Sequence, residues 1–178
     1  MTQYLGLLGS INVGGNRIAM ADLKAAMERE GFANVATIAA SGNVLFDSDS
    51  ADISTLERQI AALVARNFDI ETFAIVRTKD QLEQALAENP FAGDGDDKLV
   101  HVMFLADQPS AAQFAQLVTD HEGRGNEKLN LGTRALHLDY VDGVASSKLT
   151  KQFIERRIGC SGTARNLSSL KNMIGKFD

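Results

Sequence analysis

The sequence predicts an α+β protein made of two consecutive units with a related order of elements. The apolar periodicity switches between the spacing of strands and that of helices, in the order β-α-β-β-α-β over the first half. The second half repeats most of this order, and an acidic stretch with two glycines, "AGDGDD" at Ala92–Asp97, separates the halves. The β-α-β-β-α-β order is the ferredoxin-like, or split βαβ, pattern. We therefore expect two tandem ferredoxin-like units, residues 1–91 with a connecting helix and residues 98–178, the second unit lacking its last strand and ending in C-terminal helices. One compact domain is the alternative.

Each element of the first half follows from a local pattern. An almost wholly apolar run predicts a buried strand, and apolar residues at helical spacing, stopped by Gly31, predict the first helix. The Gly42-Asn43 pair is typical of a tight turn between two strands. Thr78 and Gln81 form a capping box that starts the connecting helix. The expected strands are Tyr4–Leu8, Val35–Ala40, Val44–Phe46 and Glu71–Arg77, and the expected helices carry Met20 to Met27, Ile53 to Val64, and Leu82 with Leu86.

The second half shows the same kinds of signal. Ser110 and Gln113 predict a capped helix, and Asn166 predicts the N-cap of the last helix. The chain between these helices predicts a hairpin that turns at Gly132-Thr133. The expected strands are Lys98–Leu105, Lys128–Leu131 and Arg134–Tyr140, and a further helix is expected over about 147–158.

Composition limits the classes of function. The chain has 178 residues and a net charge of −5, which disfavours a broad nucleic-acid surface. Cys160 is the only cysteine, so no internal disulfide can form, as is usual in a reducing compartment. The first residues lack the pattern of a signal peptide, and no apolar run is long enough to span a bilayer. We expect a cytoplasmic protein that does not contact a membrane.

Two loops of the first half are expected to meet at one edge of the sheet. The crossover rule makes the first and second strands parallel, and the third strand returns between them. The end of the first strand and the turn after the second strand then lie on the same rim. This places Asn12–Arg17 beside Ser41–Asn43.

The composition of these loops is compatible with two interpretations. The stretch "GSINVGGNRIAM" offers backbone amides and a guanidinium to an anion ahead of a helix N-terminus, but it contains neither a P-loop nor a G-x-G-x-x-G motif. The alternative is a tight connection that needs glycine. The candidate ligand-binding residues are Asn12, Gly14, Gly15, Asn16, Arg17, Ser41, Gly42, Asn43 and Arg165. Arg165 stands at a helix start, where the dipole opposes it, so its partner is a carboxylate, a carbonyl or a ligand.

Other reactive side chains give no defined site. The histidines are scattered, no metal-ligand spacing occurs, and the serines lack a nucleophile elbow. We identify no catalytic residue, no metal and no cofactor, and whether the protein is an enzyme stays open. The leading hypothesis is a module that binds a small anionic ligand at the rim. The alternative is a protein–protein interaction module or homodimer with purely structural loops.

Several segments together resemble one family of bacterial proteins, catalogued as domain of unknown function 1697. Gly9 and Ser10 stand where relatives usually have arginine and glycine, and Leu167 stands where many have tryptophan. The resemblance implies a ferredoxin-like α+β fold and no established activity. The segments that carry it are "GSINVGGNRIAMADL" (Gly9–Leu23), "ASGNVLF" (Ala40–Phe46), "VRT" (Val76–Thr78), "NPF" (Asn89–Phe91) and "TARN" (Thr163–Asn166).

Overall fold

The chain folds into two compact units. A computed structural model describes residues 1–12, 15–39 and 41–178. The first unit comprises Met1–Gln81 with Lys176–Asp178, and the second comprises Leu82–Gly175. The stretch 92–97, expected as the linker, therefore lies inside the second unit. It is held there because Asp97 accepts a backbone hydrogen bond from Ser168 (3.1 Å) and pairs with Lys171 (2.7 Å).

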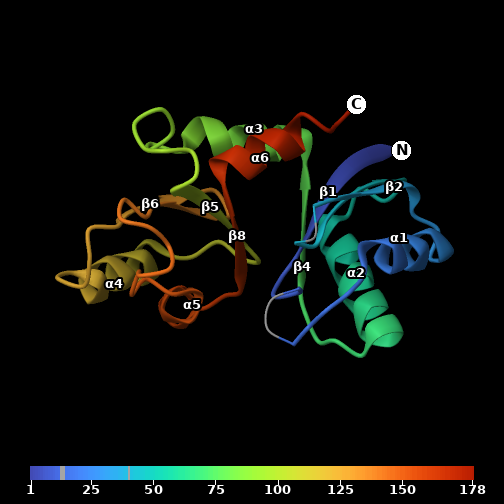
Figure 1. Ribbon diagram of the computed structural model, residues 1–178, viewed down its shortest axis with the longest axis horizontal. Coiled ribbons are helices and arrows are strands. Elements are labelled where there is room, and N and C mark those ends of the chain that lie inside the picture. Colours follow the sequence, from blue (N-terminus) through green and yellow to red (C-terminus); the bar gives the residue numbers. More distant parts are fainter. Residues whose placement is uncertain (13–14, 40) are drawn as a thin grey trace. The chain divides into compact units, whose positions relative to one another are not determined.

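The first unit is a four-stranded antiparallel sheet with two helices. The strand order is β2-β3-β1-β4, so β3 lies between the parallel strands β1 and β2, as the crossover rule predicts. Figure 1 shows α1 and α2 on the same side of this sheet. The elements are β1 (Thr2–Leu8), α1 (Met20–Arg29), β2 (Ala33–Ile38), β3 (Asn43–Ser48), α2 (Ile53–Phe68) and β4 (Ala74–Thr78), with α3 (Lys79–Glu88) spanning the division between the units.

The second unit has a complete four-stranded sheet of order β6-β7-β5-β8, which corrects the expectation that its last strand is missing. The missed strand is β8, Gly162–Asn166, which pairs antiparallel with β5. Its sequence, GTARN, has no run of large apolar residues, so periodicity does not reveal it. The elements are β5 (Val100–Leu105), α4 (Ala111–His121), β6 (Lys128–Gly132), β7 (Ala135–Asp139), α5 (Lys151–Ile158), β8 and α6 (Leu167–Ile174).

The two sheets repeat each other position by position. Leu5 on β1 pairs with Arg77 on β4, and Val102 on β5 pairs with Arg165 on β8. Each arginine donates to the carbonyl of the residue before it, at 2.9 Å in both cases. The next residue along the chain, Thr78 or Asn166, then caps a helix. The internal repeat thus extends to individual side chains.

Each sheet buries an apolar face under its own two helices. Phe46 on β3 is fully buried and contacts Tyr4 and Phe32, with ring centroids 5.8 Å and 5.0 Å away. The corresponding core of the second unit gathers around the β5–β7 pair. Its members include Met103, Leu105, Leu117, Leu136, Leu138, Ile154 and Ile158. The helices over these faces are amphipathic, and the predicted capping boxes at Thr78 and Ser110 are confirmed.

Candidate functional site

The rim of the first sheet forms where β1 ends. The backbone N–H of Leu8 donates to Gly42 O at 2.9 Å, and the N–H of Gly9 donates to Phe73 O at 3.0 Å. Ile11 then packs against Gly42, because a Cβ built on that glycine would lie 2.7 Å from Ile11 Cδ1. The loop after β1 and the turn after β2 therefore meet, as the topology predicts.

Asn12 closes the loop on itself. Its side-chain oxygen accepts from the N–H of Ile18 at 2.8 Å, and its side-chain nitrogen donates to Ile18 O at 3.2 Å. Its backbone N–H also donates to Asn16 O. Asn12 is thus committed to the shape of the loop, with a left-handed backbone (φ 55°) that asparagine tolerates better than most residues.

The turn between β2 and β3 differs from the predicted Gly42-Asn43 pair. Ile38 pairs with Asn43, so β2 ends at Ile38 and Asn43 belongs to β3, while residue 40 lies outside the described residues. The buried Asn43 side chain donates to Ile38 O (3.2 Å) and to Ser41 Oγ (3.1 Å). Gly42 has φ 78° and is buried. Asn43 and Gly42 therefore shape the turn, while Ser41 is exposed.

Three candidate residues of the first loop face solvent. Gly15, Asn16 and Arg17 are all exposed. The Asn16 side chain donates a long hydrogen bond to Ser10 O, at 3.3 Å, and within the described part of the chain the Arg17 guanidinium has no ion pair or hydrogen bond. Gly14 lies outside the described residues. The loop leads into α1, whose N-cap Ala19 supplies no side-chain hydrogen bond.

The second unit shows how short this connection can be. The same backbone bonds recur there, since Leu105 N–H donates to Arg134 O (2.9 Å) and Ala106 N–H donates to Ser161 O (2.9 Å). Residues 106–110 then suffice to reach α4, whereas the first unit uses residues 9–19 to reach α1. Fewer residues also join the next two strands, since Gly132 pairs with Ala135 in the second unit whereas Ile38 pairs with Asn43 in the first.

The extra residues can be located within the first loop. Ile11 covers the turn in the first unit, and Gln108, at the corresponding position, covers it in the second by bonding Arg134 N (2.6 Å) and Gly132 O (3.2 Å). Just before each helix, Ile18 and Pro109 are both buried. The first unit therefore carries an insertion, Asn12–Arg17. The two hydrogen bonds between the Asn12 side chain and the backbone of Ile18 hold the ends of this insertion together.

Comparisons with known proteins identify the family of the chain and its fold. The family model described as "Protein of unknown function (DUF1697)" matches residues 1–137. The chain belongs to the DUF1697 family. Its structure is also similar to that of conserved bacterial protein SP0830 from Streptococcus pneumoniae, with a TM-score of 0.73 and 20% sequence identity over 98% of this chain and 97% of that one. No curated protein matches the chain. At this identity, the structural match shows the shared fold alone.

Arg165 of this DUF1697 protein lies on β8, in the second unit. Its guanidinium donates to Thr163 Oγ1 at 2.7 Å and to Ala164 O at 2.9 Å. Burial lowers the pKa of Arg165 to about 10. A carbonyl is thus one of its partners, as one of the sequence alternatives predicts, and the repeat gives it the same local role as Arg77.

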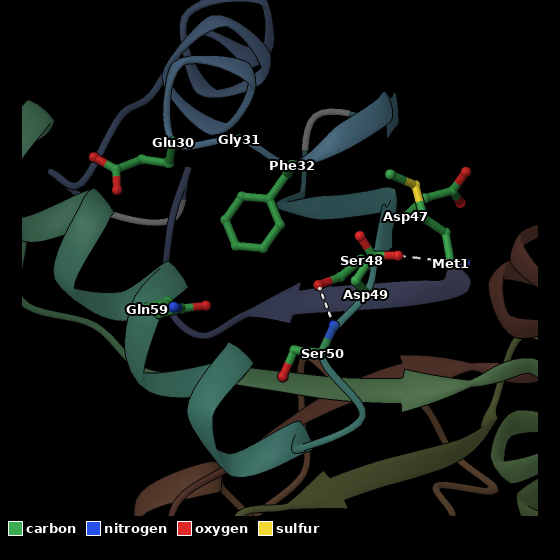
Figure 2. Close-up of a pocket in the computed structure, with 9 residues that line it drawn as sticks. All are labelled: Met1, Glu30, Gly31, Phe32, Asp47, Ser48, Asp49, Ser50 and Gln59. Carbon is green, nitrogen blue, oxygen red and sulfur yellow. Dashed lines mark hydrogen bonds and ion pairs between the residues drawn. The ribbon is translucent and has the colours of Figure 1, made fainter.

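A separate hollow of about 270 Å³ in the first unit was not indicated by the sequence analysis. Figure 2 shows it between the α1–β2 turn and the end of β3. Each of its carboxylates has a partner, since Arg66 pairs with Glu30, the N-terminal ammonium pairs with Asp49 at 3.5 Å, and Asn34 donates to Asp47 Oδ2 at 2.7 Å. The other oxygen of Asp47, Oδ1, is buried and accepts no hydrogen bond from the described residues. The lining residues are Met1, Glu30, Gly31, Phe32, Asp47, Ser48, Asp49, Ser50 and Gln59. The only sequence sign of this hollow is the DSDS run at 47–50.

Two histidine–glutamate pairs also escaped sequence analysis, because their members are distant in the chain. His137 on β7 is fully buried and lies 3.2 Å from Glu88, which also accepts from Thr133. His121 lies 3.2 Å from Glu127, which Ser147 also binds. In both clusters the carboxylate accepts the hydroxyl hydrogen bond directly, so neither is a Ser-His-acid arrangement.

Metal and thiol chemistry receive little support in the described residues. Over the ranges 1–12, 15–39 and 41–178 no group of three histidine, cysteine or acidic residues is placed to hold a metal ion. Burial raises the pKa of the Cys160 thiol, which disfavours the nucleophilic thiolate. None of the helices in the described ranges is long and apolar enough to cross a membrane.

We expect acid to destabilise the fold through His137. Burial lowers the pKa of His137 below the ordinary value of 6.5, and Glu88 opposes this only in part. The unfolded chain then binds more protons than the folded chain, so stability is full above about pH 6.5 and falls as the pH drops toward the folded pKa. Urea unfolding at pH 7.5 and 5.5 measures the loss.

His137→Gln is the matched variant, since it keeps a donor for Glu88 and does not titrate. It should show a smaller loss between the two pH values than the wild type. His101, whose pKa burial also lowers, accounts for part of the remainder. If the wild type and His137→Gln lose the same free energy of unfolding between the two pH values, the loss is not due to His137.

Proposed function

We propose that the first unit binds a small anionic ligand at the Asn12–Arg17 insertion. The observation that carries the proposal is the comparison of the two units within one chain. A connection built only to join a strand to a helix is completed in the second unit by residues 106–110, without glycine. The insertion and its glycines are therefore dispensable for the connection itself, which favours a role in binding.

The chemistry of the exposed residues favours an anion. Arg17 offers a planar fork of donors that fits carboxylate or phosphate oxygens. Asn16 and Ser41 add polar donors on the same rim, and the first turn of α1 has no side-chain cap. Asn12 fixes the loop before binding, and this reduces the entropy that a ligand must overcome.

Thermal unfolding with a panel of phosphate, nucleoside monophosphates and carboxylates tests the proposal. A ligand present at about 100 times its dissociation constant adds about 2.7 kcal/mol to stability. Arg17→Ala should weaken binding about tenfold or more, because a hydrogen bond to a charged group is worth about 1.5–3 kcal/mol. Arg156→Ala, at an exposed arginine on α5, is the control and should bind like the wild type.

A loop graft separates binding from folding. In this variant the sequence of residues 106–110 replaces residues 9–19. It should keep the circular dichroism of the wild type and lose the response to the anion. If the graft cannot fold, the insertion is structural. If no anion stabilises the wild type more than Arg17→Ala, the binding proposal fails.

We further infer that both units are ferredoxin-like. The order β2-β3-β1-β4, with β1 and β2 parallel about β3, supports this inference for the first unit, and the order β6-β7-β5-β8 supports it for the second.

A further inference from the structure

The four outer strands of the two sheets differ in how their edges are protected. An outer strand exposes unpaired N–H and C=O groups that can pair with another chain, and proteins commonly block them. In this chain β2, β4 and β8 each carry such a block within the strand. The strand β6 is the exception among the described residues.

The edge of β2 is irregular and covered. Its register shifts between Ala33 and Ala36, and Asn34 takes a left-handed backbone with φ 48°. Lys24 on α1 then donates to Val35 O at 2.8 Å. A second strand cannot pair along this edge without breaking these features.

The edges of β4 and β8 are each capped by the glutamate at the fifth position of the second helix of the unit. Glu57 on α2 accepts from the N–H of Val76, the third residue of β4, at 3.0 Å. Glu155 on α5 accepts from the N–H of Gly162, the first residue of β8, at 3.3 Å, and within β8 Arg165 also donates to Ala164 O at 2.9 Å. In each unit the second helix thus supplies a carboxylate that occupies a backbone donor of the last strand.

By contrast, β6 is regular and open. It pairs with β7 without a register shift from Lys128 to Gly132. Among the described residues, the side chain that bonds to the backbone of β6 is Gln108. It donates to the carbonyl oxygen of Gly132, the last residue of the strand. Lys128 and Asn130 are exposed, and Leu129 and Leu131 are half-buried. Because β6 is antiparallel to β7, every second residue of β6 directs its backbone N–H and C=O away from β7.

We propose that β6 pairs with β6 of a second copy of this chain, antiparallel about a two-fold axis at Asn130. The sequence KLNLG is suited to pairing with itself. Leu129 then faces Leu131, Asn130 faces its own copy, and Lys128 faces Gly132, so no like charges oppose each other. Joining the two sheets through so short a strand forms a weak, reversible dimer.

Sedimentation over a concentration series from micromolar to millimolar tests the proposal. The wild type should show a monomer–dimer equilibrium. Asn130→Lys should weaken dimerisation about tenfold, since it places two like charges opposite each other. Asn130→Glu should do the same, and an equimolar mixture of the two variants should form a heterodimer tighter than either homodimer.

Ala36→Lys on β2 is the matched control, because it adds a charge at an exposed position of the other unit's outer strand. It should dimerise like the wild type. Circular dichroism confirms that each variant is folded. A wild type that stays monomeric throughout the concentration series overturns the proposal. A dimer whose dissociation constant Asn130→Lys leaves unchanged also overturns it, and so does a mixture of the two Asn130 variants that dimerises no more tightly than each variant alone.

Discussion

Replacing Phe46 by alanine should lower the free energy of unfolding by about 3–5 kcal/mol, a large part of the 5–15 kcal/mol typical of a domain. The side chain is fully buried on β3 and lies between Tyr4, stacked at 29°, and Phe32, edge-on at 71°. Truncation removes apolar burial and leaves a cavity between two rings fixed by separate segments. Neither ring can fill it without distorting its own strand or turn.

Urea unfolding followed by circular dichroism measures this loss. Phe46→Leu is the matched variant, because it keeps most of the apolar volume and should cost much less than alanine. A loss below about 1 kcal/mol for Phe46→Ala would mean that the site collapses, and it would contradict the packing described for the first core.

Local patterns predicted most of the fold. The helix carrying Ile53 to Val64 was predicted from its apolar stripe, and the caps at Thr78, Ser110 and Asn166 were predicted from side chains that satisfy backbone amides within three residues. Such signals depend on neighbours in the chain and therefore survive in a sequence. The parallel arrangement of β1 and β2 was also predictable, because chain handedness fixes it.

The strand β8 was missed because its stability comes from pairing with distant residues. Its backbone bonds go to β5, and Arg165 and Thr163 satisfy each other beside it. Nothing in GTARN taken alone separates this arrangement from a helix lead-in. The equivalence with AIVRT at 74–78 becomes visible only once the registers of both sheets are known.

The sequence predicted that the two loops meet, but not how their side chains are used. The meeting of the loops follows from topology, whereas the hydrogen bonds that Asn12 and Asn43 make inside the loops depend on geometry that a sequence does not show. A sequence lists donors without showing which are already occupied. The insertion itself could not be recognised either, since it is defined by comparison with residues 106–110 of the second unit.

Alanine substitutions at three glycines should separate the cost of backbone strain from the cost of crowding. Of the three, Gly42→Ala, at the rim of the first sheet, should lower the free energy of unfolding most. Gly42 has φ 78°, and an added Cβ would lie 2.7 Å and 2.8 Å from Ile11 carbons and 3.1 Å from Leu8 Cβ. The left-handed backbone costs about 1–2 kcal/mol for a residue with a side chain. Crowding in a packed region adds about 1–3 kcal/mol.

The other two glycines isolate the components. Gly31 has φ 95° with nothing within 4 Å of an added Cβ, so Gly31→Ala should show the backbone cost alone. Among the described residues nothing lies within 4 Å of a Cβ added to exposed Gly15, so Gly15→Ala should show no crowding cost. Adding Ile11→Val to Gly42→Ala should recover part of the crowding cost and none of the backbone cost. If Gly31→Ala and Gly42→Ala lower the free energy of unfolding equally, the Ile11 side chain moves aside at little cost. The contact between Ile11 and Gly42, which joins the loop to the turn, would then contribute little to the stability of the rim.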